Sequence, residues 1–269
     1  MLGPVSLRIR DCDRVMAFWQ GMLGLQSVIL ADGRIALATA GAEHPVLLLE
    51  IDPDAAEPGP GASGLYHVAL LLPDRASLGH AFLALDRAGG RPAFVGAADH
   101  EVSEALYYRD PEGNGLELYR DRPRDEWRHV RRGGGEELLM GSDPLDLEGI
   151  LAESGEPAPR APALPAGTVV GHVHLQVVDL ERTSAFYQEQ LGMDVTVRSY
   201  PGARFLSWDG YHHHLGLNIW GGHARTAAPP GARGLIGWSV RFPGSAGEPE
   251  ERVLGDPDGV RVSVVGRPA

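Results

Sequence analysis

Two stretches of the chain, VSLRIRDCDRVMAFWQGMLGL at residues 5–25 and HVHLQVVDLERTSAFYQEQLGM at residues 172–193, follow one pattern. Each begins with alternating apolar residues, passes an aspartate, and continues with apolar residues at helical spacing up to a Leu-Gly pair. The alternation is typical of a half-buried strand, and the wider spacing is typical of an amphipathic helix. We expect Asp11 and Asp179, or residues next to them, to cap these helices, and Gly24 and Gly192 to follow the helix C-termini. The repeat predicts a chain assembled from similar βα modules.

Two further parts of the chain repeat this pattern and add a closing hairpin. GLYHVALLLPDRASLGHAFLALDRAGG, residues 64–90, predicts a strand and a helix, and ALYYRDPEGNGLELYRDRP, residues 105–123, predicts two strands around a D-P-E-G-N-G turn. GLIGWSVRFPG (residues 234–244) and DPDGVRVSVVG (residues 256–266) match the first strand and the hairpin of that module. Residues 244–254, which separate them, are too few and too rich in Gly and Pro for a normal helix. The fourth module is therefore expected to be truncated.

The predicted fold class is α+β, with four βαβββ modules forming two curved mixed sheets. Residues 122–166 interrupt the repeats with a charged stretch and a Pro/Ala-rich stretch, a composition typical of a linker. Within it, DPLDLEGILAE at residues 143–153 predicts one short helix. The expected limits are an N-terminal domain of residues 1–121 with modules 1–52 and 63–121, a linker of residues 122–166, and a C-terminal domain of residues 167–269 with modules 167–222 and 232–266.

The bulk composition excludes several classes of protein. A net charge of −12 over 269 residues argues against nucleic-acid binding, which needs a basic face. No apolar run approaches the roughly 18 residues of a membrane span, and the first residues lack the layout of a secretory signal. The single cysteine, Cys12, excludes an internal disulfide and a thiolate metal cluster. We expect a cytoplasmic protein that binds neither nucleic acid nor membrane.

Histidine and glutamate occupy equivalent positions in the repeats. His172 and His174 share one face of their predicted strand because they are two residues apart. His67 lies in the corresponding strand of module two, and Glu117 lies between two leucines in the last strand of that module. A carboxylate in an apolar strand needs a cation, hydrogen bonds or a proton. Two imidazoles and one carboxylate on converging strands match the ligand set of non-haem Fe(II) oxygenases.

Structural roles are the alternative for each of these residues. A single histidine in a strand is more often a core or edge residue than a ligand, and Glu117 could instead pair with Arg109 or Arg120. The recurrence of the three side chains at equivalent repeat positions favours the metal site.

Two further clusters could contribute catalytic groups. His212, His213 and His214 precede an apolar strand, and alternation points either His213 alone or the other two toward the interior. Tyr107 and Tyr108 precede the D-P-E-G-N-G turn, and one of them must face the same side as Glu117. That tyrosine could be core packing or a phenolic proton donor.

These stretches resemble the modules of the vicinal oxygen chelate superfamily, which contains glyoxalases, bleomycin resistance proteins and dioxygenases. The whole chain, including YRDRPRDEW at residues 119–127 and GYHHHLGLN at residues 210–218, is similar to bacterial extradiol ring-cleaving enzymes of the catechol 2,3-dioxygenase kind. The resemblance implies an oxidoreductase that cleaves a catechol-type diol with molecular oxygen. The alternatives are a metal isomerase or lyase of the glyoxalase type and a non-catalytic small-molecule binding protein of the drug-resistance type.

The resemblance also implies roles for single residues. His67, His172 and Glu117 match the family's metal ligands, whereas His174 does not. His213 matches the acid–base histidine, and Tyr107, ten residues before Glu117, matches the family tyrosine. Fe(II) is the favoured metal, with Mn(II), Zn(II) or Ni(II) as alternatives. We expect a small aromatic substrate and molecular oxygen as partners, with Trp208 or Trp220 as an apolar wall, and leave open whether the protein is a homo-oligomer.

Module four departs from the family pattern. Well-known two-domain ring-cleaving enzymes take two ligands from this module, but Gly237 and Ser263 hold those positions here. Module one has Pro4 at its first-strand position and Glu50 in its last strand. A complete triad therefore requires modules two and three to form one sheet, and we expect modules one and four to form the other without a metal.

Overall fold

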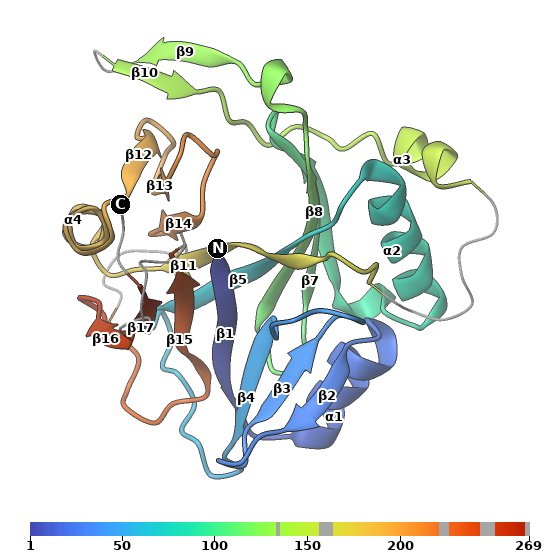
Figure 1. Cartoon of the computed structure of the whole chain (residues 1–269), viewed down its shortest axis with the longest axis vertical. Coiled ribbons are helices and arrows are strands. Elements are labelled where there is room, and N and C mark those ends of the chain that lie inside the picture. Colours follow the sequence, from blue (N-terminus) through green and yellow to red (C-terminus); the bar gives the residue numbers. More distant parts are fainter. Residues whose placement is uncertain (133–134, 156–163, 221–225, 243–250, 267–269) are drawn as a thin grey trace.

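The computed structural model describes residues 1–132, 135–155, 164–220, 226–242 and 251–266. Within these residues, two large mixed sheets form the body of the molecule (Figure 1). The first has eight strands in the order β12 (Asp194–Val197), β13 (Ala203–Ser207), β14 (Leu215–Asn218), β11 (Val169–Gln176), β5 (Gly64–Leu71), β8 (Gly115–Asp121), β7 (Ser103–Arg109) and β6 (Phe94–Asp99). The second has seven strands in the order β16 (Glu251–Gly255), β17 (Arg261–Val265), β15 (Gly234–Arg241), β1 (Leu2–Ile9), β4 (Leu47–Ile51), β3 (Ile35–Ala38) and β2 (Gln26–Ile29).

The strand order confirms the predicted α+β class and the predicted pairing of modules. Antiparallel pairing of β5 with β11 joins modules two and three, and antiparallel pairing of β1 with β15 joins modules one and four. Each sheet thus combines one module from each half of the chain. The domain limits at residues 121 and 167 remain a prediction. Residues 244–254 of module four are expected to form no normal helix. Of these, residues 244–250 lie outside the described residues.

The helices begin where the sequence predicts. The carboxylates of Asp11, Asp74 and Asp179 accept hydrogen bonds from backbone N–H groups in the first turns of α1 (Cys12–Met16), α2 (Arg75–Arg87) and α4 (Leu180–Leu191). After α4, Gly192 takes a left-handed conformation with φ 63°, which a glycine adopts without strain. The first predicted helix continues beyond α1 as a π-helix, Ala17–Met22.

The helix of one module holds the turn of the next. Trp19 donates from Nε1 to the carboxylate of Asp110 at 3.2 Å, and the Tyr187 hydroxyl donates to Asp256 at 2.9 Å. Asp110 and Asp256 each accept backbone N–H bonds within their own turns. These paired contacts join modules one and two, and modules three and four, in the same way. One hydrophobic core includes buried side chains of both sheets.

The predicted linker carries defined structure. A hairpin of β9 (His129–Arg132) and β10 (Gly135–Leu138) projects from one end of the molecule, and α3 (Leu147–Ser154) lies beside α2 (Figure 1). Short 3-10 turns cover Arg91–Ala93 and Arg124–Glu126. The short helix expected at residues 143–153 is confirmed by α3. Residues 156–163 of the Pro/Ala-rich stretch lie outside the described part.

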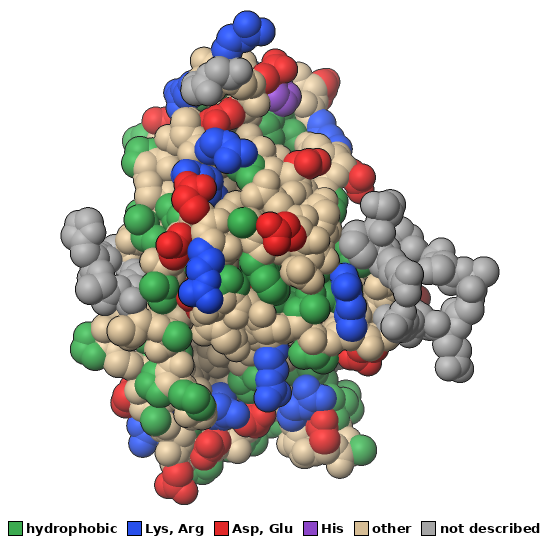
Figure 2. All heavy atoms as spheres, turned by 90° about the vertical axis from the view of Figure 1, so that its left-hand side faces the viewer, with side chains coloured by type: hydrophobic (Ala, Val, Ile, Leu, Met, Phe, Trp, Pro, Cys, Tyr) green, Lys and Arg blue, Asp and Glu red, His purple; other side chains and the backbone are tan. Residues whose placement is uncertain are grey.

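One face of the molecule shows mixed charge. Figure 2 shows basic and acidic side chains interspersed on one face, without a large area of a single sign. None of the helices in the described ranges is long and apolar enough to cross a membrane.

Candidate active site

Three adjacent strands bring the three predicted metal ligands together. The Nε2 atom of His67, on β5, lies 2.9 Å from Oε2 of Glu117, on β8. The Nε2 atom of His172, on β11, lies 3.1 Å from the same oxygen and 3.3 Å from Nε2 of His67. All three side chains are buried. Among the described residues, these three form the one group of His, Cys, Asp and Glu side chains close enough to share an ion.

Strand register explains this convergence. Ala69 of β5 is the register partner of Glu117 on the parallel side and of His172 on the antiparallel side. His67 precedes Ala69 by two residues and therefore lies on the same face of the sheet. A register shift between Val170 and His172 places His172 opposite Ala69, while His174 pairs with His67.

The protonation states suit a cation. Burial lowers the pKa of His172 to about 4, so its ring is neutral at neutral pH. Burial of Glu117 opposes its charge, but the contacts with His172 and His67 outweigh burial and hold the pKa of the carboxyl well below its usual value. A neutral imidazole and an ionised carboxylate are the forms that bind metals.

The spacing of the donor atoms also fits one ion. Two ligand atoms at right angles around an ion, each about 2.1 Å away, are about 3 Å apart, and the three separations are 2.9, 3.1 and 3.3 Å. The ring of His172 lies between Tyr119 and His213, with centroid distances of 4.8 and 4.1 Å. Its Nδ1 atom has no hydrogen-bond partner among the described residues, so ring packing orients it.

A cavity of about 300 Å³ opens onto the triad. That volume accommodates a small aromatic molecule, because ligand pockets start at about this size. The lining is mainly aromatic and histidine side chains, with Met140 and Ser142 contributed by the predicted linker. The aromatic residues of the wall include Tyr66, Tyr107, Tyr200, Phe205 and Trp220. Of the two candidate tryptophans, Trp220 therefore lines the cavity, whereas Trp208 packs against Phe242.

His213 lines this cavity beside His172, and its two neighbours point elsewhere. Nδ1 of His213 lies 2.7 Å from Nδ1 of His212, and Nε2 of His212 lies 2.8 Å from Oδ1 of Asp121. His214 bonds to the Ser207 hydroxyl at 2.9 Å. Strand alternation does not decide these orientations because the three histidines precede β14 and lie outside a regular strand. Burial lowers the pKa of His213 well below its ordinary value, so the ring is neutral at neutral pH.

Tyr107 is the tyrosine that faces the triad. It is the register partner of Glu117 between β7 and β8, while Tyr108 packs against Phe94 in the core. The Tyr107 hydroxyl lies 2.6 Å from Nε2 of His100, a residue that the sequence analysis did not identify. Burial and the nearby charge of Glu117 raise the pKa of Tyr107, which keeps the phenol protonated.

His174 also reaches the cavity but lies outside the convergent set. Its ring centroid is 4.9 Å from that of His67, and its Nε2 atom is buried without a hydrogen-bond partner in the part of the chain described. Of the two arginines considered as partners of Glu117, Arg120 pairs with Glu104 instead. The ion pairs of Glu117 in the described part of the chain are with His67 and His172.

The second sheet has no comparable set among its described residues. Gly237 and Ser263 occupy the expected positions, and the carboxylate of Glu50 lies 2.6 Å from the Arg8 guanidinium.

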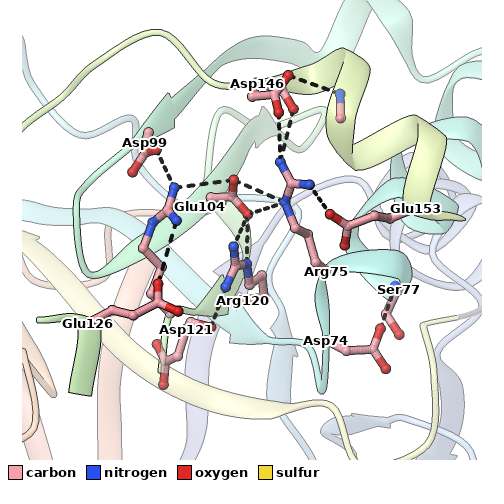
Figure 3. Close-up of polar contacts among 12 residues, drawn as sticks. Asp74, Arg75, Ser77, Asp99, Glu104, Arg120, Asp121, Glu126, Asp146 and Glu153 are labelled. Atoms are coloured by element: carbon pink, nitrogen blue, oxygen red, sulfur yellow. Dashed lines mark hydrogen bonds and ion pairs between the residues drawn. The ribbon is translucent and has the colours of Figure 1, made fainter. Parts of the chain in front are cut away.

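A separate polar cluster stabilises the outer part of the eight-stranded sheet (Figure 3). The buried carboxylate of Glu104 pairs with Arg75 at 2.8 Å and with Arg120 at 2.5 Å. A third guanidinium, that of Arg122, lies 3.5 Å away. Arg75 also contacts Asp146, which connects α2 to the N-terminus of α3. Arg120 lies three residues after Glu117 on β8, so the cluster is on the opposite face of the strand from the triad.

Comparisons with known proteins show which family the chain resembles. Residues 1–118 and 169–239 match the family described as the Glyoxalase/Bleomycin resistance protein/Dioxygenase superfamily. The chain is 42% identical to Catechol-2,3-dioxygenase of Bacillus subtilis (strain 168), over 90% of this chain and 82% of that protein. It is 31% identical to Biphenyl-2,3-diol 1,2-dioxygenase 2 of Rhodococcus globerulus, over 47% of this chain and 68% of that protein. The crystal structure of glyoxalase I from Zea mays has a similar fold, with a TM-score of 0.53 at 15% identity over 98% of this chain and 92% of that chain.

Proposed function

The chain belongs to the glyoxalase/bleomycin resistance/dioxygenase superfamily, and on that premise we propose that it opens the ring of a catechol-type diol with molecular oxygen. It is an enzyme of the dioxygenase kind. The observation that carries the proposal is the convergence of His67, Glu117 and His172 beneath an aromatic cavity. Cleavage next to the two hydroxyl-bearing carbons, the extradiol reaction, is the outcome that this site supports.

His67, His172 and Glu117 would hold one divalent ion. Two imidazoles and one carboxylate favour Fe(II), and Mn(II), Zn(II) or Ni(II) could occupy the same ligands. Any of these ions would supply Lewis acidity toward the diol, and a redox-active ion such as Fe(II) would also supply a path for electrons between the diol and oxygen. One carboxylate in the convergent set favours this reaction over the glyoxalase type, in which two carboxylate ligands are expected.

His213 would receive a hydroxyl proton of the diol. Its ring is neutral and lines the cavity beside the triad, so an unprotonated ring nitrogen is available as a base. The presence of His213 and Tyr107 in the cavity counts against the alternative of a passive binding protein.

Tyr107 would hold the diol in register through its oxygen. Nδ1 of His100 donates to the Gly141 carbonyl at 2.7 Å. In a neutral His100, Nε2 is then an acceptor, and the Tyr107 hydroxyl donates its hydrogen to it at 2.6 Å. The lone pairs of the Tyr107 oxygen remain available, so Tyr107 would accept a hydrogen bond from a substrate hydroxyl.

Oxygen uptake tests the proposal directly. The purified chain is loaded with Fe(II) without oxygen, then mixed with catechol, methylcatechols or biphenyl-2,3-diol in air-saturated buffer. We expect one O₂ consumed per diol and a yellow ring-fission product, and neither with the Glu117→Gln variant. Absence of uptake with every diol, together with isomerisation of a glutathione hemithioacetal, would instead indicate the glyoxalase reaction.

A further inference from the structure

A chain of hydrogen bonds runs from His213 in the cavity to a carboxylate at the end of β8. Nδ1 of His213 meets Nδ1 of His212 at 2.7 Å, and Nε2 of His212 meets Oδ1 of Asp121 at 2.8 Å. His212 is completely buried, so water does not substitute for either partner. Asp121 is four residues after Glu117 on β8 and thus shares its face of the strand.

The carboxylate of Asp121 determines which nitrogen atoms of His212 and His213 donate these hydrogen bonds. An ionised carboxylate only accepts hydrogen bonds, so Nε2 of His212 carries the hydrogen. Nδ1 of a neutral His212 is then an acceptor, and Nδ1 of His213 must donate to it. The remaining nitrogen of a neutral His213, Nε2, carries a lone pair and has no hydrogen-bond partner among the residues that the structure describes.

We propose that Asp121, acting through His212, is a positioning residue that fixes the hydrogen of His213 on Nδ1 and leaves the Nε2 lone pair facing the cavity. The inference rests on the proposed function in one respect, that His213 receives the substrate proton. The opposite tautomer would direct an N–H group at the diol hydroxyl and could not receive its proton.

Neighbouring aromatic side chains hold Asp121 and His212 in place. The Tyr211 hydroxyl donates to the same oxygen of Asp121 at 3.1 Å and contacts the Tyr119 hydroxyl at 2.9 Å. The ring centroids of Tyr211 and Trp127 lie 4.1 and 5.3 Å from the ring centroid of His212. The orientation of Asp121 and His212 is therefore set by packing as well as by their own hydrogen bond.

Three variants separate the acceptor role from charge and from general stability. Asp121→Leu removes the acceptor, whereas Asp121→Asn keeps an oxygen for His212 and removes the charge. Asp125→Leu makes the same substitution at an exposed aspartate nearby and serves as the control. All three are made in the full chain, and metal content is measured for each.

Nitrogen-15 NMR of the histidine rings reads the tautomers without any turnover. In the chain with and without Zn(II), we expect the Nδ1–H form for His213 and the Nε2–H form for His212. Both forms should persist in Asp121→Asn and Asp125→Leu and be lost in Asp121→Leu. An Nε2–H tautomer for His213 in the unmodified chain would overturn the proposal.

Kinetics with Fe(II) and a diol give the second readout. Asp121→Leu should lower kcat by about 10- to 100-fold, the usual cost of losing the partner that orients a functional histidine, with metal content unchanged and KM little affected. Asp121→Asn should recover most of kcat. Unchanged kcat in Asp121→Leu contradicts the inference. If the unmodified chain opens no diol, the proposed function fails, while the NMR spectra still decide the tautomer.

Discussion

Gly216 lies directly against the ring of His174. The two are register partners on β14 and β11, and a Cβ atom at Gly216 would lie 2.8 Å from Cγ of His174. The missing side chain of Gly216 therefore makes the space that the His174 ring occupies, next to His67 in the cavity.

Gly216→Ala should destabilise the protein, because the new methyl group displaces a buried ring. Overpacking of this kind costs about 1–3 kcal/mol, which urea unfolding would measure. Gly255→Ala is the matched control, since Gly255 also lies in a strand and an added Cβ there would meet nothing within 4 Å. Equal stability of both variants would show that His174 moves aside without cost.

Removal of any one triad ligand should abolish tight metal binding. His67→Gln, His172→Gln and Glu117→Gln are each expected to lose the ion during dialysis against a chelator, as measured by elemental analysis. His174→Gln should retain about one ion per chain, because His174 lies outside the convergent donor set. If the His172 variant retained the metal and the His174 variant lost it, His174 would be the ligand and His172 would not.

His213→Gln should separate proton transfer from metal binding. We expect full iron content and a decrease in kcat of about 10²–10⁴-fold, the usual contribution of a positioned acid–base group. Stopped-flow measurement of ring opening under air provides kcat, and anaerobic titration of the diol provides binding. Turnover at the rate of the unmodified chain from pH 6 to 9 would exclude His213 as the base.

Glu104→Gln should destabilise the protein by about 3 kcal/mol, because it leaves closely packed arginines without their buried carboxylate. Glu126→Gln is the control: its carboxylate pairs with Arg122 at 4.0 Å but its side chain is 54% exposed, compared with 1% for Glu104. Exposed pairs contribute about 0–1 kcal/mol, so this variant should unfold nearly as the unmodified chain does. Equal urea midpoints for both variants would show that the cluster in Figure 3 adds little to stability.

Stability of the metal-free chain should decrease in mild acid. Burial lowers the pKa of His172 from 6.5 to about 4, so between these values the unfolded chain binds a proton that the folded chain does not. Its contribution is fully present above the unfolded pKa and is lost as the pH falls through this window. At about 1.4 kcal/mol per pKa unit, the loss approaches about 3 kcal/mol.

Urea unfolding at pH 7.5 and pH 4.5 measures this effect. His172→Gln should flatten the pH dependence, whereas His129→Gln, at an exposed position, should leave it unchanged. Parallel curves for His172→Gln and the unmodified chain would show that His172 does not remain neutral in the folded state.

Much of the fold could be predicted because its signals are local. Alternating strands, helix caps at Asp11 and Asp179, and the Asp-Pro turns each depend on residues within a few positions of one another. The pairing of modules was predicted from the resemblance to the family, because Gly237 and Ser263 hold no ligand side chains at its module-four positions. The pairing of β9 with β10 was missed because the charged composition of this region resembles that of a linker.

By itself, the sequence determined the modules and the candidates His67, Glu117 and His172, because repeat position identifies them without knowledge of distances. The choice of His213 and Tyr107 came from the resemblance to the family. Only the tertiary structure decided how these candidates are oriented. The register shift before His172 selects it over His174 for the triad, and Asp121 meets His212 across 91 positions of chain. Such contacts depend on how separate strands pack against each other, and that information is not present in the spacing of residues along one strand.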